Sequence, residues 1–432
     1  MKKIIAVFVL AISAFTACKK DDQPLFTKSP DERLNEALTA YQTKLTGAPN
    51  GWKGFVYPKT GGVYSFYFKF NDSNRVVMLS SFDSVSAVTP KESSYRLKAL
   101  QQPSLLFDTY SYLHVLADPN PDVNAGTLGA GLQSDFEFYF DSSSADTINL
   151  VGRFNGSKAT LIQATPGEAA GFVNGELAQG FLLNKIQTYY QRVTTSAGTF
   201  DFHIDPSART ISLPDATGNL LDTLLTRRYY MTFGGIGFIR PLVAGNQNIT
   251  GISNISYNSS NQTISCTVNN AAATISNVTV PLKVDVNAPR RWWNTATADS
   301  SYWISVTGFH ANGIDNAYRL DTLTLGNLSF YFLVYYPNFD PGNDLFGPVF
   351  TNPSFDSVKL YGSAPKQPVY TSDGRAVFTN LGTYGAVPST GGGATTIIQL
   401  FNARGYYFVQ TSQFSYDMVS AADGRSWINW FK

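Results

Sequence analysis

The sequence predicts a mainly β protein, of the β-rich α+β kind, in which two tandem helix-plus-antiparallel-meander units precede a C-terminal β domain. Apolar and polar residues alternate in segments such as "VYSFYFKF" and "RVVMLS", a period of two that is typical of half-buried strands. Aromatic residues make up 14% of the chain and charged residues only 15%, so a sizeable core is available. The segment "FYFKFNDSNRVVML" also matches "FDFHIDPSARTISL" at a constant offset of 134 positions (200 − 66), which indicates a duplicated unit.

The first unit is expected over residues 29–167. Ser29 can cap a helix that has Pro30 in its first turn, Glu32 can complete a capping box, and Gly47 can end the helix. Strands are predicted near 54–58, 63–70, 75–81, 92–99, 104–109, 135–141, 147–153 and 158–164. Eight such strands suggest a lipocalin-like barrel or half-barrel, which the sequence allows to be either hollow, with one small ligand, or filled.

The second unit is expected over 168–280 and the C-terminal domain over 281–432. In the second unit a helix is predicted over 176–193, followed by a related meander. In the C-terminal domain the segment "APRRWWNTATA" is a candidate short helix, and "TTIIQLF" is one of several candidate strands. Long connections rich in Gly, Pro and Asn separate these strands, and binding sites tend to lie on such loops.

The first residues carry an export and anchoring pattern. Residues 1–17 form a predicted signal peptide, in which Lys2 and Lys3 precede an apolar run too short to span a bilayer. Small residues before Cys18 resemble a bacterial lipobox, so Cys18 is the expected lipidation site and 18–28 a lipidated tether; the alternative is an ordinary secretion signal. Residues 19–22, "KKDD", resemble the signal that sends lipoproteins of the Bacteroidota to the cell surface. We therefore expect a lipid-anchored protein of the outer membrane, exposed to the outside.

Composition and motifs argue against several functions. With a formal charge of +1, the chain lacks the excess of basic residues that binding to nucleic acid requires. No nucleotide, zinc-protease or hydrolase motif is present, and the three histidines have no ligand spacing, so no catalytic residue, metal or cofactor is predicted. His203 is expected to point to solvent, His114 to lie on a helix or strand face, and His310 to lie at a turn, where a function is most plausible.

Two pairs of carboxylates have structural explanations that compete with a functional one. Asp135 and Glu137 are expected on the solvated outer face of a strand. Asp340 and Asp344 could offer oxygen ligands to calcium, but their spacing does not match an EF-hand, and a turn rich in Asp, Asn and Gly is the preferred interpretation.

Aromatic residues of the last third are the predicted ligand-binding group, because exposed rings bind sugars and other flat ligands by stacking. The candidates are Trp292, Trp293, Trp303, Tyr335 and Tyr336. Trp427 and Trp430 belong to the same group, although at least one of them is expected in the core. Adjacent residues on a helix are not easily both buried, so one of Trp292 and Trp293 is expected to be exposed.

Five Asp-Ser/Thr-apolar triplets resemble the O-glycosylation sequon of secreted Bacteroidota proteins. The candidate acceptors are Ser84, Thr147, Thr223, Thr322 and Ser357. Glycans on these residues would require their side chains to lie at the surface.

Several segments carry a family resemblance. "SPDERLNEALTAYQTKLTGAPNGWKGFVYP", "FDTYSYLHVLADP" and "TINLVGRFNGSKATLI" resemble the uncharacterised family called domain of unknown function 4302, a group of Bacteroidota lipoproteins, over about 28–280. The resemblance implies a setting beside TonB-dependent transporters and SusD-like receptors or neighbouring surface lipoproteins, and it transfers no functional residue. A non-catalytic binding or accessory role in nutrient uptake is therefore expected. The alternatives are a hydrolase acting on a host or dietary polymer and an adhesin or protein-partner module.

Overall fold

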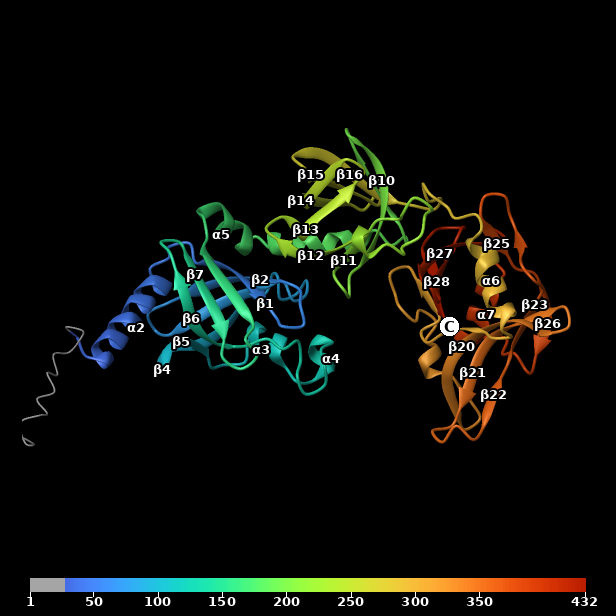
Figure 1. Ribbon diagram of the computed structural model, residues 1–432, viewed down its shortest axis with the longest axis horizontal. Helices are drawn as coiled ribbons and strands as arrows, with labels where there is room; N and C mark the ends of the chain where they lie inside the picture. Colours follow the sequence, from blue (N-terminus) through green and yellow to red (C-terminus); the bar gives the residue numbers. More distant parts are fainter. Residues whose placement is uncertain (1–27) are drawn as a thin grey trace, which may run out of the picture.

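The computed structural model describes residues 28–432, and its architecture is mainly β (Figure 1). Two closed barrels of antiparallel strands, β1 to β8 and β9 to β16, precede a curled 13-stranded sheet. The predicted fold class and the repeated unit are confirmed. Residues 1–27, with the signal peptide and Cys18, lie outside the described residues. No helix within 28–432 has the length and hydrophobicity that crossing a membrane would take.

Helix α2 (Pro30–Thr46) opens the described chain as the sequence predicts. The Ser29 hydroxyl accepts a hydrogen bond from the Glu32 backbone N–H, and the Glu32 carboxylate accepts one from the Ser29 N–H, which completes the capping box. The helix is held to the first barrel by the Trp52 indole N–H, which donates to the Leu45 carbonyl at 2.9 Å. The helix therefore belongs to the barrel unit.

The first barrel follows the predicted meander closely. Its strands are β1 (Trp52–Tyr57), β2 (Tyr64–Phe70), β3 (Arg75–Ser80), β4 (Lys91–Leu100), β5 (Gln102–Phe107), β6 (Glu137–Ser143), β7 (Thr147–Gly152) and β8 (Lys158–Gln163), with short helices α3 (Tyr112–Ala117) and α4 (Pro121–Asn124) between β5 and β6. Pairing of β1 with β8 closes it. A Cβ on Gly54 would lie 2.6 Å from the Phe68 ring, because inward-pointing aromatic side chains fill the interior.

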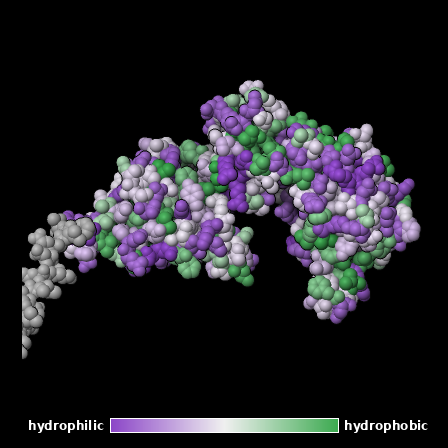
Figure 2. Space-filling model, in the orientation of Figure 1, coloured by the Kyte–Doolittle hydropathy of each residue, from purple (hydrophilic) through white to green (hydrophobic). Residues whose placement is uncertain are grey.

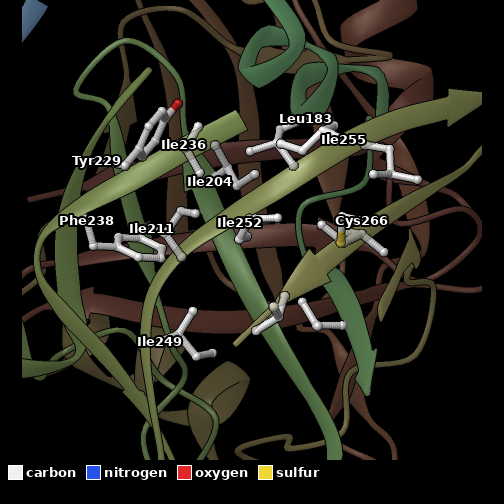
Figure 3. Close-up of a cluster of buried hydrophobic side chains, with 14 of the residues drawn as sticks. Leu183, Ile204, Ile211, Tyr229, Ile236, Phe238, Ile249, Ile252, Ile255 and Cys266 are labelled. Atoms are coloured by element: carbon white, nitrogen blue, oxygen red, sulfur yellow. The ribbon is translucent and has the colours of Figure 1, made fainter. Parts of the chain in front are cut away.

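The second barrel begins after α5 (Pro166–Val173) and the 3-10 helix η1 (Glu176–Lys185). Its strands are β9 (Gln191–Thr195), β10 (Gly198–Asp205), β11 (Thr210–Ser212), β12 (Thr226–Thr232), β13 (Gly235–Ala244), β14 (Gln247–Asn258), β15 (Thr263–Val268) and β16 (Ala271–Asn277), with the 3-10 turn η2 (Thr223–Leu225) before β12. Branched side chains such as Ile204, Ile211 and Ile252 fill this barrel as well (Figure 3). Both barrels are thus filled with side chains.

The helix predicted over 176–193 is wrong in type and extent. Its first part is η1, which packs so closely that a Cβ on Gly180 would lie 2.4 Å from the Met231 sulfur. Its last part is β9, which pairs with both β10 and β16 and so closes the barrel. Strand pairing across the barrel overrides the local helical pattern here.

The C-terminal domain is one curled sheet with two helices against its inner face. It contains α6 (Ala288–Ala298), β17 (Trp303–Ser305), β18 (Phe309–Ala311), η3 (Leu320–Thr322), β19 (Thr324–Leu325), β20 (Leu328–Asp340), β21 (Asn343–Thr351), β22 (Val358–Leu360), β23 (Gly362–Pro365), β24 (Val369–Tyr370), β25 (Arg375–Val377), β26 (Asn380–Tyr384), α7 (Gly391–Leu400), β27 (Tyr406–Ser412), β28 (Ser415–Ser420) and β29 (Ser426–Phe431). The short helix predicted in "APRRWWNTATA" is confirmed as α6. The strand predicted over 395–401 is wrong, because Thr396, Ile397 and Leu400 are buried at helical spacing in α7.

The three units touch one another through specific contacts. Between the barrels, the Ser65 hydroxyl donates to the Met231 carbonyl at 2.5 Å, and the Arg209 guanidinium donates to the Ser81 carbonyl at 2.6 Å. Between the second barrel and the last sheet, the Gln410 backbone N–H donates to the Asn219 side chain at 2.8 Å. The boundary near residue 280 is therefore a packed joint.

Candidate functional site

Four of the five aromatic residues predicted to bind ligand are core residues. Trp292, Trp303 and Tyr335 are 0% exposed and Trp293 is 8% exposed. The Trp292 ring lies 4.7 Å from the Tyr335 ring and 5.9 Å from the Trp303 ring, between α6 and the inner face of the sheet. The expectation that Trp292 or Trp293 is exposed is wrong, because α6 is covered by the curl of the sheet and both indoles are enclosed. Trp430 is also buried, as expected for one of the last two tryptophans, and Trp427 is half-buried.

Asp344 helps to hold these aromatic side chains in the core. Its carboxylate is 1% exposed and accepts hydrogen bonds from the Trp293 indole N–H at 2.9 Å, the Tyr335 hydroxyl at 2.6 Å and the Asn338 backbone N–H at 2.8 Å. Burial raises the pKa of Asp344, and these donors oppose that rise. The predicted turn is formed by Pro341 and Gly342 between β20 and β21, and Asp344, the second residue of β21, uses its side chain to anchor α6 to the sheet.

The fifth predicted residue, Tyr336, lies on the opposite face of the sheet. Along β20, Leu333 and Tyr335 point into the core, whereas Val334 and Tyr336 point outward, as the two-residue period requires. Outward rings from β20 and its neighbours form a continuous surface that we call the outer aromatic face. Its members are Tyr302, Tyr331, Phe332, Tyr336, Phe339, Phe355 and Tyr384.

In the outer aromatic face each ring touches the next. The ring centroids are 5.2 Å apart for Phe355 and Tyr331, 4.9 Å for Tyr331 and Phe332, and 6.2 Å for Phe332 and Tyr302. They are 5.4 Å apart for Tyr302 and Tyr336, and the run continues through Phe339 to Tyr384. The face is therefore long and made of aromatic rings from end to end.

Much of this surface is open to solvent. Tyr302, Tyr331, Phe339 and Phe355 are 43%, 48%, 40% and 58% exposed. The half-buried rings pack on a layer of buried aliphatic residues, Val334, Leu345 and Val349. Figure 2 shows hydrophobic residues gathered at the end of the C-terminal domain where β21 and β22 lie in Figure 1. Exposed apolar patches of this kind mark binding surfaces.

The outer aromatic face carries no charged residue of its own. On β22, Leu360 packs under the face. Because side chains alternate along a strand, the preceding residue, Lys359, points to the other side of the sheet. The acids at its two ends are Asp340 and Asp356. Burial, together with the nearby Asp340 carboxylate, raises the pKa of Tyr384 to about 12, so this hydroxyl stays protonated at neutral pH. The face offers rings and hydroxyl groups to a ligand, without a positive charge among its residues.

The three histidines have defined structural partners. His114 lies on α3, as expected, and its Nδ1 is 3.1 Å from the Ser111 backbone N–H. His203 is half-buried, with Nδ1 2.7 Å from the Tyr189 carbonyl and its ring stacked on Tyr189, so the expectation that it points to solvent is wrong. His310 lies on β18 beside Asp315, whereas the sequence predicted a turn.

The prediction that Asp135 and Glu137 lie on a solvated strand face is also wrong. Asp135 is 3% exposed, and its carboxylate accepts hydrogen bonds from the backbone N–H groups of Phe154, Asn155 and Ser157 at 2.8, 2.8 and 3.0 Å. It fixes the loop between β7 and β8, whereas Glu137 is half-buried at the start of β6. Within residues 28–432 no group of three or more His, Cys, Asp or Glu side chains is arranged to hold a metal ion.

The candidate glycosylation residues differ in exposure. Ser84, Thr223 and Thr322 are exposed, whereas Thr147 and Ser357 are half-buried. Glycan attachment stays a prediction at all five. Cys266 is buried, and burial raises its pKa to about 11, so its thiol is unreactive at neutral pH.

Of the comparisons with known proteins, the family model covers the barrels. The family model described as "Domain of unknown function (DUF4302)" matches residues 22–258, which include α2, the first barrel and most of the second. No curated protein matches the chain. Among solved structures, the DNA polymerase III subunit beta from Borrelia burgdorferi in complex with a natural product aligns at 8% identity over 92% of this chain and 97% of that one. The TM-score of 0.14 is too low for this similarity to carry any argument.

Proposed function

The chain belongs to the family described as domain of unknown function DUF4302, and from that premise we propose that it is a lipid-anchored, non-catalytic binding protein of the bacterial cell surface. In this proposal Cys18 carries the lipid, and the C-terminal domain, outside the matched residues, carries the ligand site. The protein would serve as an accessory component of a nutrient-uptake system built around a TonB-dependent transporter or a SusD-like receptor.

The observation that carries the proposed binding role is the outer aromatic face. Its rings are in mutual contact, partly exposed and without charge. Sugar rings present apolar C–H faces that stack on aromatic rings, while their hydroxyl groups can pair with those of tyrosine. An acidic polymer would call for lysine or arginine at the surface. We therefore propose a neutral polysaccharide as the ligand.

The position of the face in the molecule fits this role. Helix α2 and the C-terminal sheet lie at opposite ends of the long axis (Figure 1). An anchor at Cys18, ten residues before the first described residue, would leave the sheet as the part farthest from the membrane. A long polymer outside the cell could reach it there without entering a pocket.

Affinity electrophoresis in gels containing soluble starch, xyloglucan or mixed-linkage β-glucan tests the proposal. We expect retardation by at least one of these polymers and weaker retardation of Tyr331→Ala and Phe355→Ala. Loss of about 0.5–1.5 kcal/mol per ring corresponds to roughly a 2- to 10-fold loss of affinity. Phe154→Ala removes a ring that is 92% exposed on the first barrel, so it is the matched control and should bind normally. Equal migration of all forms, or no retardation by any neutral polymer, would refute the proposal.

A protein partner is the second candidate, because interface cores are also rich in aromatic residues and poor in charge. A photo-crosslinking amino acid at position 331, used in cells, separates the two cases. Crosslinking to one defined outer-membrane protein that Phe355→Ala abolishes, without polysaccharide binding in gels, would favour the adhesin or protein-partner role.

A further inference from the structure

A cleft of about 480 Å³ lies between the second barrel and the C-terminal domain. Its lining includes Gln191, His203 and Asp205 from the barrel and His310, Asp315 and Trp427 from the last domain. A volume in this range suits a small molecule, and interfaces between domains are frequent ligand sites. This cleft is separate from the outer aromatic face and does not depend on it.

Two residues that line the cleft each carry a buried acceptor atom without a donor. Gln191 is 4% exposed; its amide nitrogen donates to the Thr188 carbonyl at 2.8 Å, while its buried Oε1 has no partner. His310 directs Nδ1 to the Asp315 carboxylate, and its buried Nε2 has no partner. A buried polar atom without a hydrogen bond destabilises the folded state, so a donor at either atom would be favourable.

The histidines present lone pairs as well. His203 donates its Nδ1 hydrogen to the Tyr189 carbonyl at 2.7 Å, and in the tautomer that this bond selects Nε2 is the acceptor. Burial lowers the pKa of His310, so this ring is neutral at pH 7 and its Nε2 is an acceptor too, because Nδ1 carries the hydrogen shared with Asp315. The cleft therefore presents acceptors from both of its walls.

The charged residues that line the cleft are acidic. Asp205 and Asp315 are the charged residues among the described side chains that line the cleft, and no lysine or arginine of that set contributes. Tyr189 and Trp427 support the two histidines of this lining, since the Tyr189 ring is stacked on His203 and the Trp427 ring on His310. A metal ion is a poor match, because the described residues hold no group of three or more suitable ligands. We propose that the cleft binds a small organic cation with N–H donors, a primary ammonium or a guanidinium.

The histidine content gives a direct test. The chain has only three histidines, so a ¹H–¹³C spectrum of protein whose histidines are labelled with ¹³C at Cε1 should show three ring signals, one for each residue. Titration with agmatine or putrescine, in buffer with EDTA, should shift the signals of His203 and His310. The signal of His114, which lies on α3 of the first barrel, should stay in place. The uncharged 1,4-butanediol and the dianion succinate should shift none of the three.

A charge-removing variant identifies the site. The Asp315 side chain is 87% exposed, so Asp315→Asn should fold normally and weaken agmatine binding about 5- to 10-fold. Asp122→Asn makes the same change on α4 of the first barrel and should leave binding unchanged. Shifts of all three histidine signals, equal binding of succinate, full affinity in Asp315→Asn, or no shift with either amine at millimolar concentration would each overturn the proposal.

Discussion

Tyr189 donates its hydroxyl hydrogen to Asp417 at 2.6 Å, and this bond joins the second barrel to the last sheet. The tyrosine is 1% exposed and the aspartate 9%. The other carboxylate oxygen of Asp417 accepts from the Asn429 amide at 2.7 Å, so both oxygens are paired. Around them Tyr190, Val278 and Val409 form a small apolar cluster across the joint. The second barrel and the last sheet therefore share a core.

The first prediction is that Tyr189→Phe weakens this joint. The change removes one of the two side-chain donors to a buried carboxylate and adds no bulk. Leaving a buried acceptor without its partner costs about 1–3 kcal/mol, more for a charged group. Urea unfolding followed by intrinsic fluorescence should show a lower midpoint. Tyr331→Phe, which removes an exposed hydroxyl, is the control and should change stability by less than about 0.5 kcal/mol. Equal midpoints for the two variants would contradict the assigned role.

The second prediction concerns pH. Burial raises the pKa of Asp417 above its ordinary value of 3.8, against the opposing effect of Tyr189 and Asn429. The folded state therefore keeps a proton that the unfolded state loses, and stability falls as pH rises from about 4 through the raised pKa. A tenfold difference in proton affinity between the folded and unfolded states corresponds to about 1.4 kcal/mol of stability.

Asp417→Asn removes this titration. The difference in unfolding free energy between the variant and the parent protein should grow in favour of the variant as pH rises from 4 to 7. Asp122→Asn, on the surface of the first barrel, should follow the parent profile. Urea midpoints at four or five pH values measure this, and parallel profiles for the parent and Asp417→Asn would contradict the assignment.

The sequence was most informative where the local pattern and the tertiary role agree. The strands of the first barrel were predictable because each alternates apolar and polar residues and because turn residues such as those in "NDSN" separate them. Closure of the barrel follows from pairing of β1 with β8, which are about a hundred residues apart, and no local pattern carries that information. The same holds for β9, whose place between β10 and β16 decided its conformation.

The binding surface was harder to predict because aromatic residues occupy both faces of one strand. In "LSFYFLVYY" Tyr335 is 0% exposed, while its neighbour Tyr336 belongs to the outer aromatic face. The alternation shows that these two residues lie on opposite faces, but only the positions of α6 and α7 show which face is inside. The sequence identified the domain and the residue class of the proposed surface, and it favoured the face that is buried.

The third prediction tests Asp135, whose carboxylate holds the loop between β7 and β8. Asp135→Ala leaves the N–H groups of Phe154, Asn155 and Ser157 without their acceptor and should cost about 2–4 kcal/mol. Asp135→Asn keeps one oxygen and should cost less. Hydrogen exchange of these amides should accelerate in the alanine variant, whereas unchanged exchange would show that the loop is held by other contacts.

The fourth prediction concerns the anchor. The chain has two cysteines, so Cys18→Ser and Cys266→Ala form a matched pair. In the native host, Cys18→Ser should abolish incorporation of labelled palmitate and release the protein from the membrane fraction, because one thiol carries the lipid. Cys266 is buried in the second barrel, so Cys266→Ala should keep the label at normal level per folded molecule. Protease treatment of intact cells should degrade the Cys266→Ala protein if it faces outward. If the Cys18→Ser protein still incorporated palmitate, lipidation at Cys18 would be refuted. If the labelled Cys266→Ala protein were protected from protease on intact cells, surface exposure would be refuted, while lipidation at Cys18 would stand.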